Sequence, residues 1–319
     1  MTRRDFLAGT TALLATADSI GGATAQPTSQ APTDLAAFTA ARRFTPTRFG
    51  RIAYVERGAG PAALFLHGFP LNGFQWRGAL DRLSAERRCV APDFLGLGYT
   101  EIAEGQSVAP AAQVEMLAAL LDHLRIDTVD IVANDSGGAV AQLFLVQHPE
   151  RVRSLLLTNC DAEPDSPPPA LLPVLALARE GRFSDAWLVP WVADKTLARS
   201  PQGLGGLTFT QPSNPTDEAI DCYLGPLVAS PARKALTNAY ALGLDPNPLA
   251  GIEPALRRAQ VPVRIVWGTG DPIFSAESPH YLDRLFPQSR GVRLVPGAKL
   301  FFPEEYPDLI AEEARLLWS

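Results

Sequence analysis

From about residue 45 onward, the chain repeats a short apolar run, a turn and a segment with helical periodicity. A continuously apolar run is typical of a strand buried on both faces of a sheet, and the helical segment returns the chain to begin a parallel neighbour. This repetition predicts the α/β class, a mostly parallel sheet flanked by helices. After an opening hairpin at Thr47–Glu56, the expected strands are Ala62–Leu66, Cys89–Ala91, Thr128–Val132, Val152–Asn159, Val261–Trp267 and Gly291–Val295.

One segment interrupts the alternation. Residues 161–245 contain many prolines and helical fragments but no strand of comparable quality. We therefore expect a helical cap over residues 161–245, inserted into a core formed by residues 45–160 and 246–319. The helices expected in the core are Trp76–Leu83, Val108–Leu124, Gly137–His148, Pro279–Phe286 and Pro307–Leu317.

Composition excludes several classes of protein. Of 319 residues 46% are hydrophobic and 19% are charged, with a formal net charge of -6, which argues against disorder. No long basic run is present, so neither a nucleic acid nor an anionic membrane is an expected partner. The three cysteines (Cys89, Cys160 and Cys222) lack zinc-site spacing, and no phosphate-binding glycine loop is found, so no metal or cofactor is expected. Oligomeric state and disulfide status stay open.

The N-terminus has the features of an export signal. Paired arginines at Arg3 and Arg4 precede Phe6-Leu7, an apolar Ala-rich stretch and a small-residue end at Ala23–Ala25. We predict a twin-arginine signal peptide over residues 1–25 and a linker over residues 26–44. The apolar stretch is too short for stable membrane insertion. The mature protein is accordingly expected to be periplasmic or secreted.

The chemistry is expected at a strand that turns sharply into a helix, Ile131–Gly138. The side chain at the apex of such a turn projects above the sheet, and small residues are needed two positions before and after it. An Asp135 apex has Ala133 and Gly137 at those positions, whereas a Ser136 apex would place Asn134 at a crowded one. This favours Asp135. A cap for the following helix is the alternative role for its carboxylate.

These motifs together resemble the α/β-hydrolase fold family over nearly everything after residue 45. His67-Gly68-Phe69-Pro70 is similar to the oxyanion loop of that family, and Pro92–Gly98 is similar to its glycine loop. An Asp at the apex resembles the haloalkane dehalogenase and epoxide hydrolase branch. The resemblance implies that Asp135 is a nucleophile that forms an alkyl-enzyme ester and that the N–H groups of Phe69 and Ser136 form the oxyanion hole. Asp271 matches the acidic member of the triad; a turn residue is its alternative role.

The sequence departs from this family at the general base. Leu300 occupies the position of the family histidine, and a leucine cannot accept a proton. Of the four histidines in the chain, His280 is the only plausible substitute. Lys299, Glu304 or Glu305 could also act as a base if burial shifted its pKa toward neutrality.

The details that define a subtype also differ. Ser136 stands where dehalogenases of this branch place a halide-binding Trp. Tyr223 and Tyr240 lie in the cap and could protonate an epoxide oxygen, as the family's cap tyrosines do, or could simply be packed in the core. Further aromatic residues of the cap are expected either to line an apolar cleft or to pack the cap onto the core: Trp187, Trp191, Phe183 and Phe209.

Three functions are consistent with this sequence. The first is a hydrolase that acts on a small apolar epoxide, haloalkane or ester through Asp135, with an atypical or absent general base. The second is a non-hydrolytic lyase or isomerase that uses Asp135 for proton transfer. The third is a ligand-binding homologue without turnover.

Overall fold

The computed structural model describes residues 34–103 and 105–319. The predicted signal peptide, residues 1–25, and residues 26–33 of the predicted linker lie outside the described residues. Within them, none of the helices combines the length and the apolar character that crossing a bilayer requires.

The described residues form one sheet of nine strands in the order β1-β2-β4-β3-β6-β7-β8-β9, with β5 paired to β2. The two leading strands are antiparallel, and the pairs from β4 to β9 are parallel. The α/β-hydrolase fold expected from the sequence is confirmed. The strands are β1 (Arg42–Thr47), β2 (Gly50–Arg57), β3 (Ala62–Leu66), β4 (Arg88–Pro92), β5 (Glu101–Ile102), β6 (Val129–Asp135), β7 (Val152–Cys160), β8 (Val263–Gly268) and β9 (Ser289–Val295).

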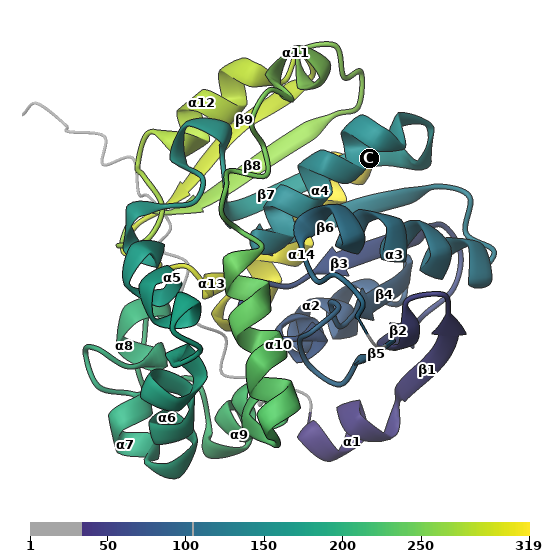
Figure 1. Cartoon of the computed structure of the whole chain (residues 1–319). Helices are drawn as coiled ribbons and strands as arrows, with labels where there is room; N and C mark the ends of the chain where they lie inside the picture. The colour runs from purple at the N-terminus through teal and green to yellow at the C-terminus, as the bar shows by residue number, and fades with distance from the viewer. Residues whose placement is uncertain (1–33, 104) are drawn as a thin grey trace, which may run out of the picture.

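Helices cover both faces of the sheet. In Figure 1, α3 and α4 lie on the near face and α14 lies on the far face. Every residue of β3 and of β6 is buried, as expected for central strands enclosed between helical layers. The helices outside the cap are α1 (Leu35–Ala40), α2 (Arg77–Leu83), α3 (Pro110–His123), α4 (Ser136–Gln147), α11 (Glu253–Leu256), α12 (Ser278–Leu285), α13 (Phe302–Glu305) and α14 (Pro307–Trp318).

The chain between β7 and β8 contains helices but no strand in the described structure. Helices α5 to α10 gather at one end of the molecule, whereas α11 lies beside α12 (Figure 1). The two longest cap helices each begin at a capping residue. Thr216 accepts a hydrogen bond from Ala219 N, and Ser230 accepts one from Arg233 N, with Pro231 in the first turn of its helix. The cap helices are α5 (Leu172–Arg179), α6 (Val189–Ala193), α7 (Lys195–Ala198), α8 (Leu204–Thr208), α9 (Asp217–Val228) and α10 (Pro231–Leu242).

One sequence prediction needs correction. The linker was expected to extend to residue 44, but Leu35–Ala40 is helix α1 and Arg42–Thr47 is strand β1. Asp34 begins the helix by accepting a hydrogen bond from Ala36 N, and Phe38 is buried against the core. The strand was overlooked because its side chains are mostly exposed, so the segment lacks the apolar run that identifies the central strands.

The turn between β6 and α4 places Asp135 at the carboxyl edge of the sheet. Asp135 has φ 53° and ψ -134°, a strained conformation for a residue with a side chain. In the β6–β7 register Asp135 lies opposite Cys160. A Cβ on Gly137 would lie 2.6 Å from His67 O and 2.7 Å from Leu66 O, so only glycine fits there.

We expect Gly137→Ala to lower the free energy of unfolding by about 1–3 kcal/mol, because the added methyl group meets backbone that cannot move aside. Gly225→Ala is the matched control: it lies inside α9, and a Cβ there meets nothing within 4 Å. The control should change the free energy of unfolding by less than about 1 kcal/mol, because the helical preference of alanine is opposed by Pro226, which disfavours the helical conformation of the residue before it. Urea unfolding of both variants measures the difference, and equal stabilities would contradict the crowding at the elbow.

Candidate active site

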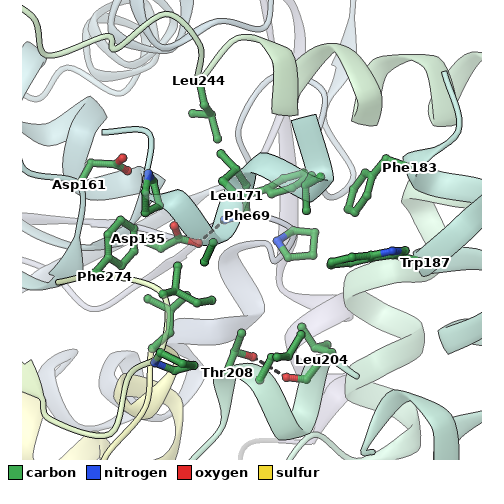
Figure 2. Close-up of a pocket in the computed structure, with 18 of the residues that line it drawn as sticks. Phe69, Asp135, Asp161, Leu171, Phe183, Trp187, Leu204, Thr208, Leu244 and Phe274 are labelled. Carbon is green, nitrogen blue, oxygen red and sulfur yellow. Dashed lines mark hydrogen bonds between the residues drawn. The ribbon is translucent and has the colours of Figure 1, made fainter. Parts of the chain in front are cut away.

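A cavity of about 230 Å³ lies between the sheet edge and the cap. Figure 2 shows Asp135 and Asp161 on one side of it and Phe183 and Trp187 on the other. Most of its lining is apolar, so a bound molecule would lose most of its contact with water. The lining residues are Phe69, Pro70, Asp135, Asp161, Pro168, Ala170, Leu171, Val174, Phe183, Trp187, Trp191, Leu204, Leu207, Thr208, Leu244, Pro272, Ile273, Phe274 and Leu300.

The carboxyl group of Asp135 is held by the backbone of two loops. Phe69 N donates to Asp135 Oδ2 at 2.9 Å, and the N–H of Ser136 also hydrogen-bonds to this carboxyl group. A Cβ on Gly68 would lie 2.5 Å from the Asp135 carboxyl group, so the glycine permits the oxyanion loop to approach. The two residues predicted as oxyanion-hole donors therefore contact the predicted nucleophile.

Asp135 lies in an environment that opposes its charge. Burial is the largest cause that raises the pKa of Asp135 well above its usual range, and the neighbouring Asp161 raises it further. The N–H groups of Ser136 and Phe69 act in the opposite direction, because they bind the carboxylate more strongly than the acid.

Asp161 is a second carboxyl group in the cavity wall and is not among the site residues predicted from the sequence. It follows β7 directly, next to the residue that pairs with Asp135. Burial raises the pKa of Asp161 to about 7, while Ser166 Oγ donates to its Oδ1 at 2.8 Å and favours the charged form. Its position in the sequence could have indicated this role, because Asp161 is an acidic residue immediately after the strand expected to lie beside the strand of Asp135.

The oxyanion loop is held in place from behind. His67 Nδ1 donates to Gly68 O at 2.9 Å, and Phe94 N donates to His67 Nε2 at 3.0 Å, so the ring is neutral with its proton on Nδ1. Burial lowers the pKa of His67, which favours that same form. His67 does not line the cavity.

Leu300 lines the cavity at the position where the resemblance implies a histidine. Its carbonyl oxygen accepts a hydrogen bond from Asn134 Nδ2 at 3.0 Å, which ties the loop to the residue before Asp135. Asn134 is buried and also donates to Thr158 Oγ1 at 3.0 Å, so this residue, which a Ser136 apex would place at a crowded position, connects neighbouring strands.

The polar residues after Leu300 contact other parts of the chain and do not line the cavity. Lys299 Nζ donates to Gly206 O. Glu304 forms a buried ion pair with Arg77 at 2.8 Å. Glu305 accepts hydrogen bonds from the N–H groups of Thr210 and Gln211 at 2.8 and 2.9 Å. These contacts fasten the loop to the cap and to α2, which leaves none of the three positioned to activate water.

Asp271 lies behind the cavity wall, beside residues that line it. Its Oδ2 accepts a hydrogen bond from Asn159 Nδ2 at 2.7 Å, and its Oδ1 accepts one from Ile273 N at 2.9 Å. Burial raises the pKa of Asp271 to about 6. Leu300 offers Asp271 no side-chain hydrogen-bond partner. The hydrogen bonds that Asp271 accepts are those of a turn residue that shapes the loop.

Neither cap tyrosine lines the cavity. Tyr223 donates to Glu304 Oε2 at 2.7 Å and accepts from Arg77 at 3.2 Å, so its hydroxyl group belongs to the buried ion pair. Tyr240 stacks on Phe69 with ring centroids 5.3 Å apart, and its Oη lies 3.1 Å from Ser136 Oγ. Tyr240 thus contacts both residues predicted as oxyanion-hole donors.

The remaining predicted residues divide between the cavity and the core. Trp187, Trp191 and Phe183 line the cavity, and the ring of Trp187 packs at a tilted angle against each of the other two. Phe209 packs against Phe301 and does not line it. His280 is exposed on α12, outside the cavity, because that helix turns its polar face to solvent.

Comparison with known proteins identifies the family. The family model for the alpha/beta hydrolase fold matches residues 61–306, and the chain belongs to that family. Haloalkane dehalogenase 2 of Mycobacterium bovis is 29% identical over 268 residues, which cover 82% of this chain and 89% of that protein. Epoxide hydrolase 2 of Siraitia grosvenorii is 43% identical over 101 residues, which cover 31% of this chain and 32% of that protein.

The fold also has close neighbours among solved structures. An alpha/beta hydrolase fold protein from Burkholderia ambifaria superposes with a TM-score of 0.74 at 24% sequence identity, covering 91% of this chain and 99% of that chain. The relatives support membership of the hydrolase superfamily.

Proposed function

We propose that this protein is a hydrolase that acts on a small apolar substrate (an epoxide, a haloalkane or an ester) through covalent attack by Asp135. One observation carries the proposal: Asp135 lines an apolar cavity while one of its carboxyl oxygens is held by the N–H of Phe69. The donor fixes one oxygen, and the carboxyl group is thereby presented to the cavity.

The reaction has two steps in this site. A carboxylate oxygen of Asp135 attacks an sp³ carbon of the substrate, the bond to the leaving group breaks, and an alkyl ester forms. Water then attacks Cγ of that ester. The negative charge that develops on the carbonyl oxygen is stabilised by the N–H groups of Phe69 and Ser136, and collapse of this intermediate releases the product alcohol.

The cavity restricts the substrate. At about 230 Å³ it is below the range of drug-sized pockets, and its walls are mainly aromatic and aliphatic side chains. A small apolar molecule fits such a site, whereas a charged one would lose its hydration without compensating donors. Fluoroacetate-like substrates are disfavoured because Ser136, and not a cation, follows the nucleophile.

Proton transfer without a covalent step is the second candidate function. Asp135 and Asp161 are two buried carboxyl groups in one cavity with no imidazole in its described lining, and both have raised pKa values. Such a pair could exchange protons with a substrate in an isomerase or lyase. The covalent adduct distinguishes this candidate, and a protein that only binds its ligand, from the hydrolase.

Asp135→Asn should abolish both adduct formation and turnover, with a loss of at least about 10³-fold, because an amide oxygen is a poor nucleophile. The measurement is intact mass and product formation after incubation with styrene oxide and with butyl iodide. Asp185→Asn is the control, an exposed carboxylate of the cap paired with Lys234, and it should behave as the wild type. Turnover that survives in Asp135→Asn would contradict the proposal.

Leu300→His should accelerate disappearance of a preformed Asp135 ester, by up to about 10²-fold, because it places an imidazole in the cavity. Leu207→His makes the same change on another part of the cavity wall and is the matched control. Rapid quench and mass measurement follow the ester. An equal effect of both variants would contradict the assignment of position 300.

We further propose that the mature protein is exported to the periplasm, as its paired arginines suggest. Replacement of both Arg3 and Arg4 by Lys should retain the protein in the cytoplasm of a bacterial host, since twin-arginine export depends on the pair. Fractionation and immunoblotting measure the distribution. Unchanged export of the doubly substituted protein would contradict this route.

A further inference from the structure

Building on the function proposed above, we propose that Asp161 is the catalytic acid and base of this site and that the substrate class is an epoxide. Asp161 would donate a proton to the epoxide oxygen in the first step and accept one from water in the second. It would thereby replace both the missing imidazole and the cap tyrosines, neither of which lines the cavity.

The topology places the two carboxyl groups side by side. Asp135 ends β6, and its register partner in β7 is Cys160, the residue before Asp161. Adjacent strands lie about 4.8 Å apart, so both side chains emerge from neighbouring strand ends at the same edge of the sheet. Both are buried and both line the cavity, as Figure 2 shows.

Each carboxyl group of the pair accepts hydrogen bonds that stabilise its charged form. Two like charges in an apolar cavity oppose each other, so the pair favours holding one proton. Asp135 receives the N–H groups of Phe69 and Ser136, and Asp161 receives the Ser166 hydroxyl group and its own N–H. The pKa of Asp161 is raised to about 7 and that of Asp135 well above its usual range, so the pair shares a single proton. The reactive form is the one with the proton on Asp161, in which Asp135 is a carboxylate and can attack.

In the first step the two carboxyl groups open the epoxide together. The Asp135 carboxylate attacks one carbon of the epoxide, the C–O bond to that carbon breaks, and the released oxygen takes the proton of Asp161. The products are a hydroxyalkyl ester of Asp135 and an ionised Asp161. Retaining glycosidases use the same combination: one carboxylate attacks the sugar carbon, and one carboxylic acid protonates the glycosidic oxygen that leaves.

The second step restores the pair. Asp161 accepts a proton from water as the water oxygen attacks Cγ of the ester, and the oxyanion is held by the N–H groups of Phe69 and Ser136. Collapse expels the diol oxygen, which takes the proton back from Asp161. Asp135 is left as the acid, and its proton passes to Asp161. The net change is epoxide plus water to diol.

The same geometry disfavours halides. A halide leaves as an anion and needs hydrogen-bond donors and no proton. Asp161 therefore contributes no proton transfer to the departure of a halide, and wherever Asp161 is ionised its charge repels the halide in a cavity of low dielectric. An epoxide oxygen, in contrast, gains most from the acid. Epoxide opening and alkyl iodide attack should therefore depend differently on Asp161, and that difference provides the test.

The experiment uses the wild type, Asp161→Asn and Glu163→Gln, with styrene oxide and butyl iodide as probes. Glu163 lies on the same loop, outside the cavity, and is the matched control. Asp161→Asn should open styrene oxide about 10²–10⁴-fold more slowly. With butyl iodide, which needs no acid, the variant should still form an Asp135 ester, and this ester should persist in the intact mass.

The outcomes separate this inference from the proposed function. If Asp161→Asn forms diol and clears the butyl ester at wild-type rates, Asp161 has no catalytic role, although the Asp135 hydrolase stands. If the wild type forms neither diol nor adduct, the proposed function and this inference both fail. If Asp161→Asn unfolds at the same temperature as the wild type, misfolding is excluded as the cause of a loss of epoxide opening.

A pH profile gives a second readout that does not need a variant at Asp161. The charged or titratable groups around it are Asp135, Asp165, Cys160 and Tyr240. Both reactions should rise with pH up to about 7, where the pair gives up its first proton and a carboxylate becomes available. Styrene oxide opening should fall again, about tenfold per pH unit, at the higher pH where the pair loses its second proton. Butyl iodide attack should lack this falling limb.

Ser166→Ala checks the assignment of that limb to Asp161. The Ser166 hydrogen bond lowers the pKa of Asp161, so its removal should move the limb to higher pH. A limb that stays in place would assign it to another group and overturn the role of Asp161.

Discussion

The hydrogen bond from Phe69 N to Asp135 Oδ2 is the interaction on which the site depends. It joins the loop after β3 to the end of β6, and both sides of the contact require special backbone. Asp135 adopts a positive φ, and Gly68 and Gly137 leave no room for a Cβ. His67 and Tyr240 then hold the loop from behind, so the strained turn is stabilised by a well-packed surrounding.

The loop after β9 contributes to the cavity and also holds the cap in place. Leu300 presents a hydrocarbon side chain where an imidazole would be expected, and Glu304 and Glu305 bind α2, α9 and the segment after α8. The loop thus fastens the cap, and the remaining titratable chemistry of the cavity lies with two carboxyl groups on adjacent strands. In a site with an imidazole, a neutral base accepts the proton. Here, the electrostatic repulsion between two carboxylates would favour proton transfer to one of them.

The parts of this structure that depend on local pattern were predictable. Continuous apolar runs predicted the central strands, and the small residues around Asp135 predicted the elbow. The exposed strand β1 gave no such signal. Asp161 was missed because its loop was read as the start of the cap, although its place after β7 put it beside Asp135. Tyr223 could not be assigned, since its partner Arg77 lies 146 positions away in sequence and becomes its neighbour only through folding.

The central claim is that substrate becomes attached to Asp135 and is released by water attack at Cγ. A single turnover of styrene oxide in water carrying heavy oxygen, with enzyme in excess, tests it most directly. Mass spectrometry should find the heavy oxygen in the peptide that contains Asp135, and the diol should be unlabelled. Label in the diol, with an unlabelled Asp135 peptide, would mean direct attack of water on the substrate and would contradict the account.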